Sequence, residues 1–350
     1  MKYSIIVPVY NRPDEVEELL ESLAKQKAGD FDIHIVEDGS TIPCREVCGR
    51  FAETFGSRMH YYEKENGGPG EARNFGAVHA GGDYFIVLDS DVVLPEGYLS
   101  AIDAELAAKP CDAFGGPDRA HPDFTPVQKA ISYAMTSFFT TGGIRGGRKK
   151  LDKFYPRSFN MGVSRELWRR LGGFRAMRFG EDIDFSLRIF KEGASCRLFP
   201  NAWVWHKRRT DFRKFFRQVY NSGVARINLH LLHPGSMKLV HMLPAMFTAV
   251  CVGLAVLLVV GLILLLCGHG SVGKVFCWIA IGLPLLYSLL IFIDSSIKNR
   301  SLKVGLFSVP ASFIQLFGYG SGFLSAARKR LVLKRAGEGF DFENNQKFYS

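Results

Sequence analysis

Residues 84–91 read YFIVLDSD, an apolar run that ends in two carboxylates, Asp89 and Asp91. The uncharged residues before the aspartates are typical of a buried β-strand, and the aspartates then fall where the strand leaves its sheet. Side chains two apart on an extended backbone point the same way, so both carboxylates can face one ligand. Two adjacent carboxylates repel unless a positive charge lies between them, which favours a hard divalent cation such as Mg²⁺ or Mn²⁺. For this tripeptide taken alone, an Asp-rich surface turn is the alternative.

Two further strand-like segments also end in polar residues. Residues 3–11 read YSIIVPVYN and residues 31–40 read FDIHIVEDGS, and helical or Gly-rich segments separate the three runs. Strands that alternate with helices predict right-handed crossovers and a mostly parallel sheet. In such sheets ligands collect at the carboxyl ends of the strands. The topology therefore predicts that these polar strand ends converge on one pocket.

The order of five motifs resembles the family 2 glycosyltransferases of the GT-A fold, over roughly residues 3–206. The motifs are PVYN, EDGS, NGGPGEARN, DSD and Gly180-Glu181-Asp182. The resemblance implies an α/β, Rossmann-like catalytic domain over residues 1–232 that binds a nucleotide-diphosphate sugar, with Mn²⁺ or Mg²⁺ as cofactor. The donor-binding residues it implies are Pro8, Tyr10, Asn11, Asp38, Arg73 and Asp89.

The chemistry of these residues suits a nucleotide. Tyr10 offers a flat apolar wall, and Asp38 can accept a hydrogen bond from a base N–H. Arg73 presents a planar, permanently charged fork for phosphate or a base edge. Its alternative is a surface ion pair with Glu71 or another carboxylate. No Gly-Lys-Ser/Thr follows the Gly-rich segment at residues 67–70, which excludes a Walker-type ATPase.

The resemblance also implies an acceptor half of the site. It identifies Asp182 as the catalytic base and Glu181 as a neighbour that helps to orient the acceptor. Acidic residues are favoured in the first turn of any helix, which is the alternative for both. His206 ends the apolar run at residues 202–206 and would complete the metal site with Asp89 and Asp91, or else only cap a turn. No partner carboxylate for a double displacement is evident, so we expect inversion.

A Gly-rich, basic segment at residues 140–153 lies between the two halves. It carries Arg145, Arg148, Lys149 and Lys150. A lid over the diphosphate, or a contact for a lipid-linked pyrophosphate, would use both the glycines and the charge. A solvated loop is the alternative.

The C-terminal third has the composition of a membrane region, at residues 238–327. Residues 242–267 and 275–293 contain no charged residue and are each long enough to span a bilayer. Residues 304–327 are also uncharged but contain Pro310 and a run of glycines. A third crossing there would place the basic start of the tail, residues 328–350, on the opposite side from Lys298, against the positive-inside tendency. The sequence therefore leaves two and three spans open.

A basic amphipathic helix is expected at residues 211–232, either in the membrane interface or packed on the catalytic domain. The net charge of the 350-residue chain is +10 and is concentrated around the hydrophobic segments. We therefore expect membrane lipids, and not nucleic acid, as the partner of this charge. The expected location is the inner (cytoplasmic) membrane, multi-pass, with the catalytic domain facing the cytosol. Cys44 and Cys48 have no matching second ligand pair, so no zinc site is expected.

These features together predict an inverting, metal-dependent glycosyltransferase that moves one sugar to a membrane-associated acceptor. The expected acceptor is a lipid-linked glycan in the synthesis of a cell-surface polysaccharide or glycolipid. The Q-x-x-R-W motif of processive synthases is absent after Gln218, which favours transfer of a single sugar. Two alternatives remain: a polyprenyl-phosphate sugar synthase, and a catalytically silent membrane scaffold of the same fold.

Overall fold

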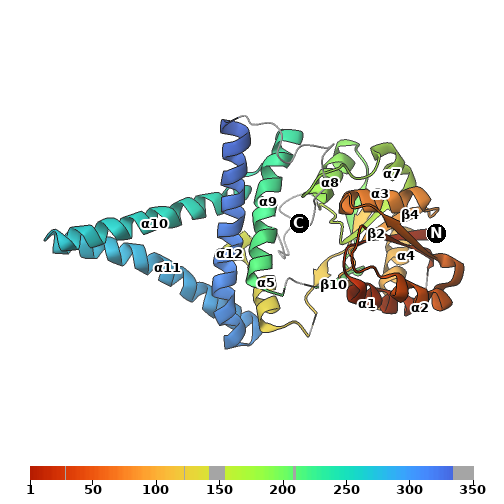
Figure 1. Cartoon of the computed structure of the whole chain (residues 1–350), viewed down its shortest axis with the longest axis horizontal. Coiled ribbons are helices and arrows are strands. Elements are labelled where there is room, and N and C mark those ends of the chain that lie inside the picture. Colours follow the sequence, from red (N-terminus) through yellow and green to blue (C-terminus); the bar gives the residue numbers. More distant parts are fainter. Residues whose placement is uncertain (28, 122, 142–153, 208–209, 334–350) are drawn as a thin grey trace. The chain divides into compact units, whose positions relative to one another are not determined.

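A computed structural model describes residues 1–27, 29–121, 123–141, 154–207 and 210–333. The chain divides into two compact units (Figure 1). Among the described residues, unit 1 comprises residues 1–121 and 154–207, and unit 2 comprises residues 123–141 and 210–333. The predicted basic segment at 140–153 lies outside the described residues beyond Thr141, as does the tail beyond residue 333.

Unit 1 is built on a seven-stranded sheet with the order β3-β2-β1-β4-β8-β6-β9. Its strands are β1 (Lys2–Val9), β2 (Asp30–Asp38), β3 (Met59–Lys64), β4 (Tyr84–Leu88), β6 (Ala113–Gly115), β8 (Asn160–Ser164) and β9 (Cys196–Leu198). The first four strands are parallel, and β8 runs antiparallel to both of its neighbours. The predicted mostly parallel sheet is therefore confirmed.

Helices connect the strands of unit 1. They are α1 (Pro13–Ala24), α2 (Arg45–Phe55), α3 (Pro69–His79), α4 (Tyr98–Ala108), α7 (Arg165–Leu171) and α8 (Glu181–Lys191), with a 3₁₀ turn, η1, at Gly56–Arg58. A second, three-stranded sheet has the order β5-β10-β7. Its strands are β5 (Val92–Val93), β10 (Val204–His206) and β7 (Asp118–Arg119).

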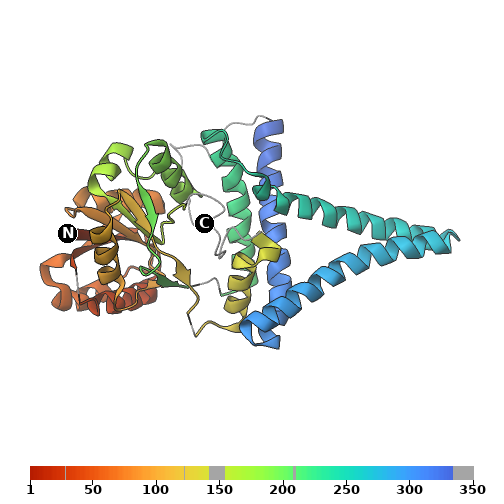
Figure 2. The same cartoon turned by 180° about the vertical axis from the view of Figure 1, so that it is seen from behind.

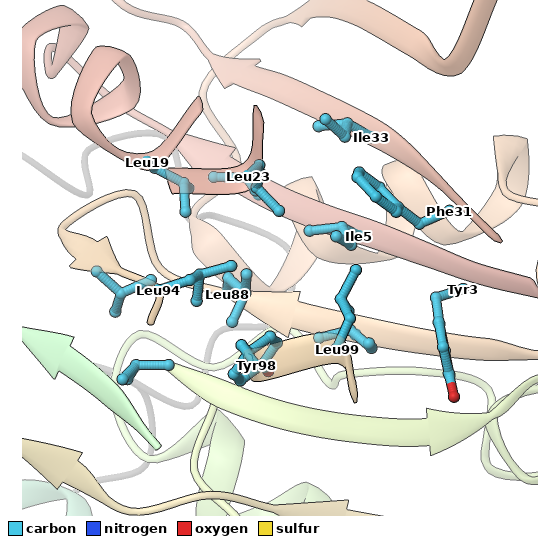
Figure 3. Packing of buried hydrophobic residues seen from close by; sticks show 14 of the residues in the cluster. Tyr3, Ile5, Leu19, Leu23, Phe31, Ile33, Leu88, Leu94, Tyr98 and Leu99 are labelled. Atoms are coloured by element: carbon cyan, nitrogen blue, oxygen red, sulfur yellow. The ribbon is translucent and has the colours of Figure 1, made fainter. Parts of the chain in front are cut away.

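The sheet buries apolar side chains on both faces, which explains the uninterrupted apolar run of β1. Ile5 packs in one core with side chains of α1 and α4, such as Leu19 and Leu99 (Figure 3). Ile6, the next residue, packs in the core on the opposite face with Val87 and Phe185. This alternation follows from the two-residue period of a strand. It fixes the register of β1 and therefore the position of the polar residues that follow it.

Unit 2 is helical. Its elements are α5 (Pro126–Thr136), α6 (Phe138–Thr141), α9 (Phe212–Leu232), α10 (Leu243–Leu266), α11 (Gly270–Asn299) and α12 (Leu302–Ala327), with short turns η2 (Leu239–His241) and η3 (Arg328–Val332). Among the described residues, three segments are long and apolar enough to cross a membrane: Leu243–Leu266, Gly270–Asn299 and Leu302–Val332. The first matches the predicted span at 242–267, and the second extends the predicted span at 275–293 in both directions. The third is a continuous helix despite Pro310 and its glycines.

Candidate active site

Polar residues that follow β1, β2 and β4 lie at one edge of the large sheet. These strands are neighbours and run parallel, so their carboxyl ends meet there. Pro8 pairs with Val36 across the β1–β2 register, and both Pro8 and Tyr10 are half-buried. The convergence predicted from the order of strands and helices is therefore present.

Asn11 and Asp38 hold the loops at this edge together. Asn11 has a left-handed backbone (φ 54°), and its side-chain oxygen accepts from the N–H groups of Thr41 and Ile42 at 2.7 and 2.8 Å. The buried carboxylate of Asp38 accepts from the N–H groups of Gly67 and Gly68 at 2.9 and 2.7 Å. It also accepts from Lys64 Nζ at 2.9 Å. With three donors in place, little accepting capacity remains on Asp38 for the base N–H predicted from the resemblance.

A group of three potential ligands lies beside β4. One ligand atom each from Asp89, Asp91 and His206 lie within 4.8 Å of one another. His206 reaches this position because β10 pairs antiparallel with β5, with His206 opposite Val92. The N–H of Lys207 also donates to the carbonyl of Asp91 at 3.0 Å. The main chain thus holds an imidazole and a carboxylate side by side, although they are far apart in sequence.

The composition of this group fits Mn²⁺ or a similar cation. Carboxylate oxygens suit hard divalent cations, and imidazole suits transition metals. His206 Nε2 lies 3.3 Å from Asp91 Oδ1, and its Nδ1 lies 4.0 Å from Asp118 Oδ2. The separation from Asp118 is longer than a hydrogen bond, so Asp118 lies near the imidazole without being bonded to it. Asp89, Asp91 and His206 could therefore hold the cation.

Arg73 joins the two halves of the site. Its guanidinium is buried, with Nη2 2.8 Å from Asp89 Oδ1 and Nη1 2.9 Å from Glu181 Oε1. Burial opposes the charge of Arg73, but the charges of Asp89 and Glu181 outweigh it and leave the pKa of Arg73 raised. The predicted alternative, a surface ion pair with Glu71 or another carboxylate, is not present, because Arg73 is buried and the carboxylate of Glu71 lies 3.9 Å from Lys64.

Asp182 and Glu181 occupy the first turn of α8. Gly180 precedes them with φ 85°, a conformation that favours glycine and turns the chain into the helix. Arg157 Nε donates to Asp182 Oδ2 at 2.5 Å, and the N–H of Ile183 donates to Oδ1 at 2.8 Å. Burial would raise the pKa of Asp182, but the charge and hydrogen bond of Arg157, with help from Arg73 and the Ile183 N–H, together leave that pKa lowered. Burial raises the pKa of Glu181, against the opposing effect of Arg73.

Four of the predicted site residues thus form one connected group. Asp89 carries one end of the Arg73 bridge, Glu181 carries the other, and Asp182 follows Glu181 directly. A model of the family described as "Glycosyl transferase family 2" matches residues 4–172. Residues 4–172 are a family 2 glycosyltransferase domain. The match assigns these residues to a family of transferases, and the sheet of this domain is that of the GT-A fold.

Curated relatives of the glycosyltransferase domain carry matching names. Glycosyltransferase GlyA of Streptococcus pneumoniae is 36% identical over 101 residues, which are 29% of this chain and 14% of GlyA. The uncharacterized glycosyltransferase EpsJ of Bacillus subtilis is 28% identical over 206 residues, which are 56% of this chain and 58% of EpsJ. The chain thus spans less than two thirds of the length of either relative.

A solved structure supports the fold over nearly the whole chain. The mannosyltransferase PcManGT of Pyrobaculum calidifontis, in complex with GDP-Man and Mn²⁺, superposes with a TM-score of 0.54. The two share 18% identity, and the match covers 95% of this chain and 88% of PcManGT. At this identity the likeness is one of fold.

The structure adds two residues that the sequence analysis did not select for the site. Arg157 contacts Asp182, and Arg12 Nη1 lies 3.4 Å from Asp91 Oδ2. Arg12 directly follows the predicted strand-end Asn11, so its position after the first strand was an available signal. Arg157 carries no comparable signal, because its contact depends on how residues 154–159 approach α8.

Proposed function

We propose that this protein transfers one sugar, with inversion, from a nucleotide-diphosphate sugar to a hydroxyl of a membrane-associated acceptor. The observation that carries the proposal is the bridge formed by Arg73. It connects Asp89 of the metal group to Glu181, the residue before Asp182. A donor-binding group and a candidate base are thereby held in one site.

Asp182 is the proposed general base. Its lowered pKa keeps it ionised near neutral pH, and Arg157 and the Ile183 N–H each hold one of its oxygens. An acceptor hydroxyl would give its proton to this carboxylate as the hydroxyl oxygen forms its bond to the anomeric carbon. The bond from that carbon to the diphosphate breaks in the same displacement, and the electron pair leaves with the nucleoside diphosphate. A single displacement from the face opposite the leaving group inverts the anomeric carbon.

Asp89, Asp91 and His206 are the proposed metal ligands, with Mn²⁺ or Mg²⁺ as the cation. When bound, the cation would supply positive charge to the diphosphate of the donor. In this proposal Pro8 and Tyr10 line the nucleoside, while Asn11 and Asp38 shape its walls by holding the loops. Arg73 positions Asp89 and Glu181 through its two hydrogen bonds.

The acceptor is proposed to be a lipid-linked glycan at the membrane surface. Three helices of unit 2 are long and apolar enough to cross a membrane, which supports membrane association. We place the protein in the inner membrane with the transferase domain in the cytosol, where nucleotide sugars are made.

The Asp182→Asn variant tests the reaction. We expect it to lose transfer by at least about a hundredfold, because general-base catalysis typically contributes 10²–10⁴-fold. Donor binding should remain, measured as the thermal shift of the purified protein with Mn²⁺ and UDP-, GDP- or dTDP-sugars. The matched control is Glu166→Gln, an exposed carboxylate on α7 with a single surface ion pair. Full turnover by the Asp182→Asn variant would refute the assignment of the base.

Activity of the Asp182→Asn variant and donor binding by the protein test the two alternative functions, a polyprenyl-phosphate sugar synthase and a catalytically silent scaffold. A polyprenyl phosphate acceptor is already ionised and needs no strong base, so retained activity with such an acceptor would favour a polyprenyl-phosphate sugar synthase. Absence of a thermal shift with every nucleotide sugar tested would favour the silent scaffold.

A further inference from the structure

The helices α10 and α11 form an antiparallel hairpin of the length of a bilayer. They pack closely near their connecting turn, where a Cβ on Gly273 would lie 2.7 Å from the carbonyl oxygen of Gly261. On α11 the residues between Lys274 and Asp294 carry no charge. These 20 steps correspond to about 30 Å of helix, the thickness of the hydrocarbon core. Asp294, paired with Lys298 at 2.9 Å, therefore marks the membrane interface at the open end of the hairpin.

Within the described residues, the hydrogen bond and the closest backbone approach between α12 and this hairpin both lie near its open end. Near its start, Ser308 shares a hydrogen bond of 2.7 Å with Ser295, next to Asp294. Further along, Gly320 lies so close to the carbonyl of Pro244 and the hydroxyl of Thr248 that no Cβ fits. Pro244 and Thr248 belong to the first turns of α10, which form the other side of the same open end.

These contacts exclude a path of α12 through the bilayer beside the hairpin. From residue 308 to residue 320 a helix advances about 18 Å. A spanning helix would carry Gly320 to the middle of α10 or α11, but Gly320 instead meets the beginning of α10. Figures 1 and 2 show the same arrangement from both sides: α12 lies across the open end of the hairpin, and the turn of the hairpin points away from it.

One side of α12 carries an apolar stripe. The spacing of Leu306, Phe313, Phe317 and Leu324 by seven, four and seven residues places them on one face. In its middle, Phe313 packs against Phe247 and Tyr287 of the hairpin. Towards the two ends of α12, the side chains of Leu306 and Leu324 are exposed by 63% and 43%. Leucines exposed on this face are suited to contact with acyl chains.

The opposite side of α12 is covered by α9 and α5. Gly318 and Gly322 lie against α9, at the side chain of Val219 and the carbonyl of Tyr220. Each of them is two residues from Gly320, and two residues correspond to a rotation of about 200° around the helix axis. Gly318 and Gly322 therefore lie on one side of α12, against α9, and Gly320 lies on the opposite side, against α10. Val304 and Ala311 share a buried cluster with Ile131 of α5.

The exposed side of α9 is basic. Arg213, Lys214 and Arg217 lie there, on the helix that covers α12.

We propose that the chain crosses the bilayer twice, through α10 and α11, and that α12 lies in the plane of the membrane. The interaction surface is the apolar stripe of α12, and its partner is the boundary between lipid headgroups and acyl chains. Because a hairpin returns to the side from which it starts, the residues before α10 and after α11 share one side. The basic residues directly after α12, Arg328, Lys329 and Arg330, then lie on the same side as Lys298, Arg300 and Lys303. This agrees with the positive-inside tendency, which a third crossing would violate.

Cysteine accessibility tests this topology without any measurement of activity, so its outcome is separate from that of the proposed reaction. Cys267 is exposed at the turn of the hairpin. One variant keeps Cys267 and replaces the other six cysteines with serine. Two more also carry Cys267→Ser and contain either Ser350→Cys in the tail or Glu53→Cys, an exposed position on α2. Each full-length protein is treated with a membrane-impermeant maleimide in right-side-out and in inverted vesicles.

We expect Cys267 to react in one vesicle orientation, and the Ser350→Cys and Glu53→Cys variants to react in the other. Reaction of the Ser350→Cys variant in the same orientation as Cys267 would show a third crossing and overturn the proposal. Reaction of Cys267 in the same orientation as the Glu53→Cys variant would show that the hairpin does not cross. If the cysteine replacements prevent folding, a C-terminal tag on the unmodified chain replaces them. Protease should then remove the tag from inverted vesicles only, and protection of the tag there would overturn the proposal.

Discussion

Arg157 Nε donates a hydrogen bond of 2.5 Å to Asp182 Oδ2, in the first turn of α8. Burial would raise the pKa of this carboxylate, and the charge of Arg157 lowers it below its usual range. Arg157 therefore helps to keep Asp182 ionised at lower pH than burial alone would allow. A residue that sets the pKa of a base without touching the substrate is a positioning residue, and its effect is visible in the pH dependence of the reaction.

We expect Arg157→Gln to move the acid limb of the pH–rate profile to higher pH. The variant loses the positive charge, so the pKa of Asp182 rises and the base becomes protonated at a higher pH. The acid limb should move by one pH unit for each unit by which the pKa rises, so activity should fall on the acid limb and stay unchanged well above it. The control is Arg170→Gln, whose ion pairs with Glu166 and Glu192 are on the surface. An equal loss of activity at all pH values would contradict the role of the charge.

Removal of Arg73 should destabilise the transferase domain. The variant Arg73→Met leaves Glu181 buried without its cation and Asp89 without its donor. Breaking a buried ion pair by removal of one partner costs about 3–5 kcal/mol, and the partial exposure of Asp89 places our expectation at the lower end. The measurement is thermal unfolding of the detergent-solubilised protein.

Arg45→Met is the matched control for this variant. Arg45 pairs with Glu63 on the surface, with its side chain 68% exposed, and exposed pairs contribute about 0–1 kcal/mol. If Arg73→Met is as stable as Arg45→Met, the bridge does not hold the two halves of the site together.

Removal of the proposed metal should abolish transfer, and Mn²⁺ should restore it. Loss of the imidazole in His206→Ala should weaken Mn²⁺ binding by about tenfold, while Asp91→Ala should weaken it more, because it also removes a negative charge. Binding is measured by titration of chelator-treated protein with Mn²⁺, and excess Mn²⁺ should rescue the His206→Ala variant. His79→Ala, an exposed histidine on α3, is the control. Unchanged Mn²⁺ affinity in His206→Ala would remove His206 from the ligand set.

Local sequence patterns were sufficient to predict the strands and the edge of the sheet at which the polar residues lie. The apolar runs before Asn11, Asp38 and Asp89 each read as a buried strand, and the parallel order of those strands follows from the intervening helices. The helix at 211–232 and the first span were likewise readable from composition and spacing. These are properties of neighbouring residues, and the structure has them at the predicted positions.

Contacts between segments that are distant in the chain could not be predicted from local patterns in this way. The pairing of Arg157 with Asp182 depends on how residues 154–159 approach α8, and neither residue marks the other in the sequence. The orientation of α12 was also open, because a run of apolar residues has the same composition whether it crosses a membrane or lies along it. The contacts of Gly320 and Gly322 distinguish a helix that crosses the membrane from one that lies along it, because Gly320 contacts the start of α10 and Gly322 contacts α9.

The glycines of α12 therefore give a test of its packing. A side chain at residue 322 would collide with the carbonyl of Tyr220, a backbone atom of α9 that cannot rotate away. We expect Gly322→Leu to force α9 and α12 apart, uncover their shared cluster, and lower the thermal stability and yield of the membrane-extracted protein. Overpacking of this kind typically costs about 1–3 kcal/mol. The matched control is Gly282→Leu on α11, where no atom lies within 4 Å of the added Cβ. Because leucine favours helix more than glycine does, the control should be neutral or slightly more stable. Equal behaviour of the two variants would mean that α9 does not cover α12 in the membrane.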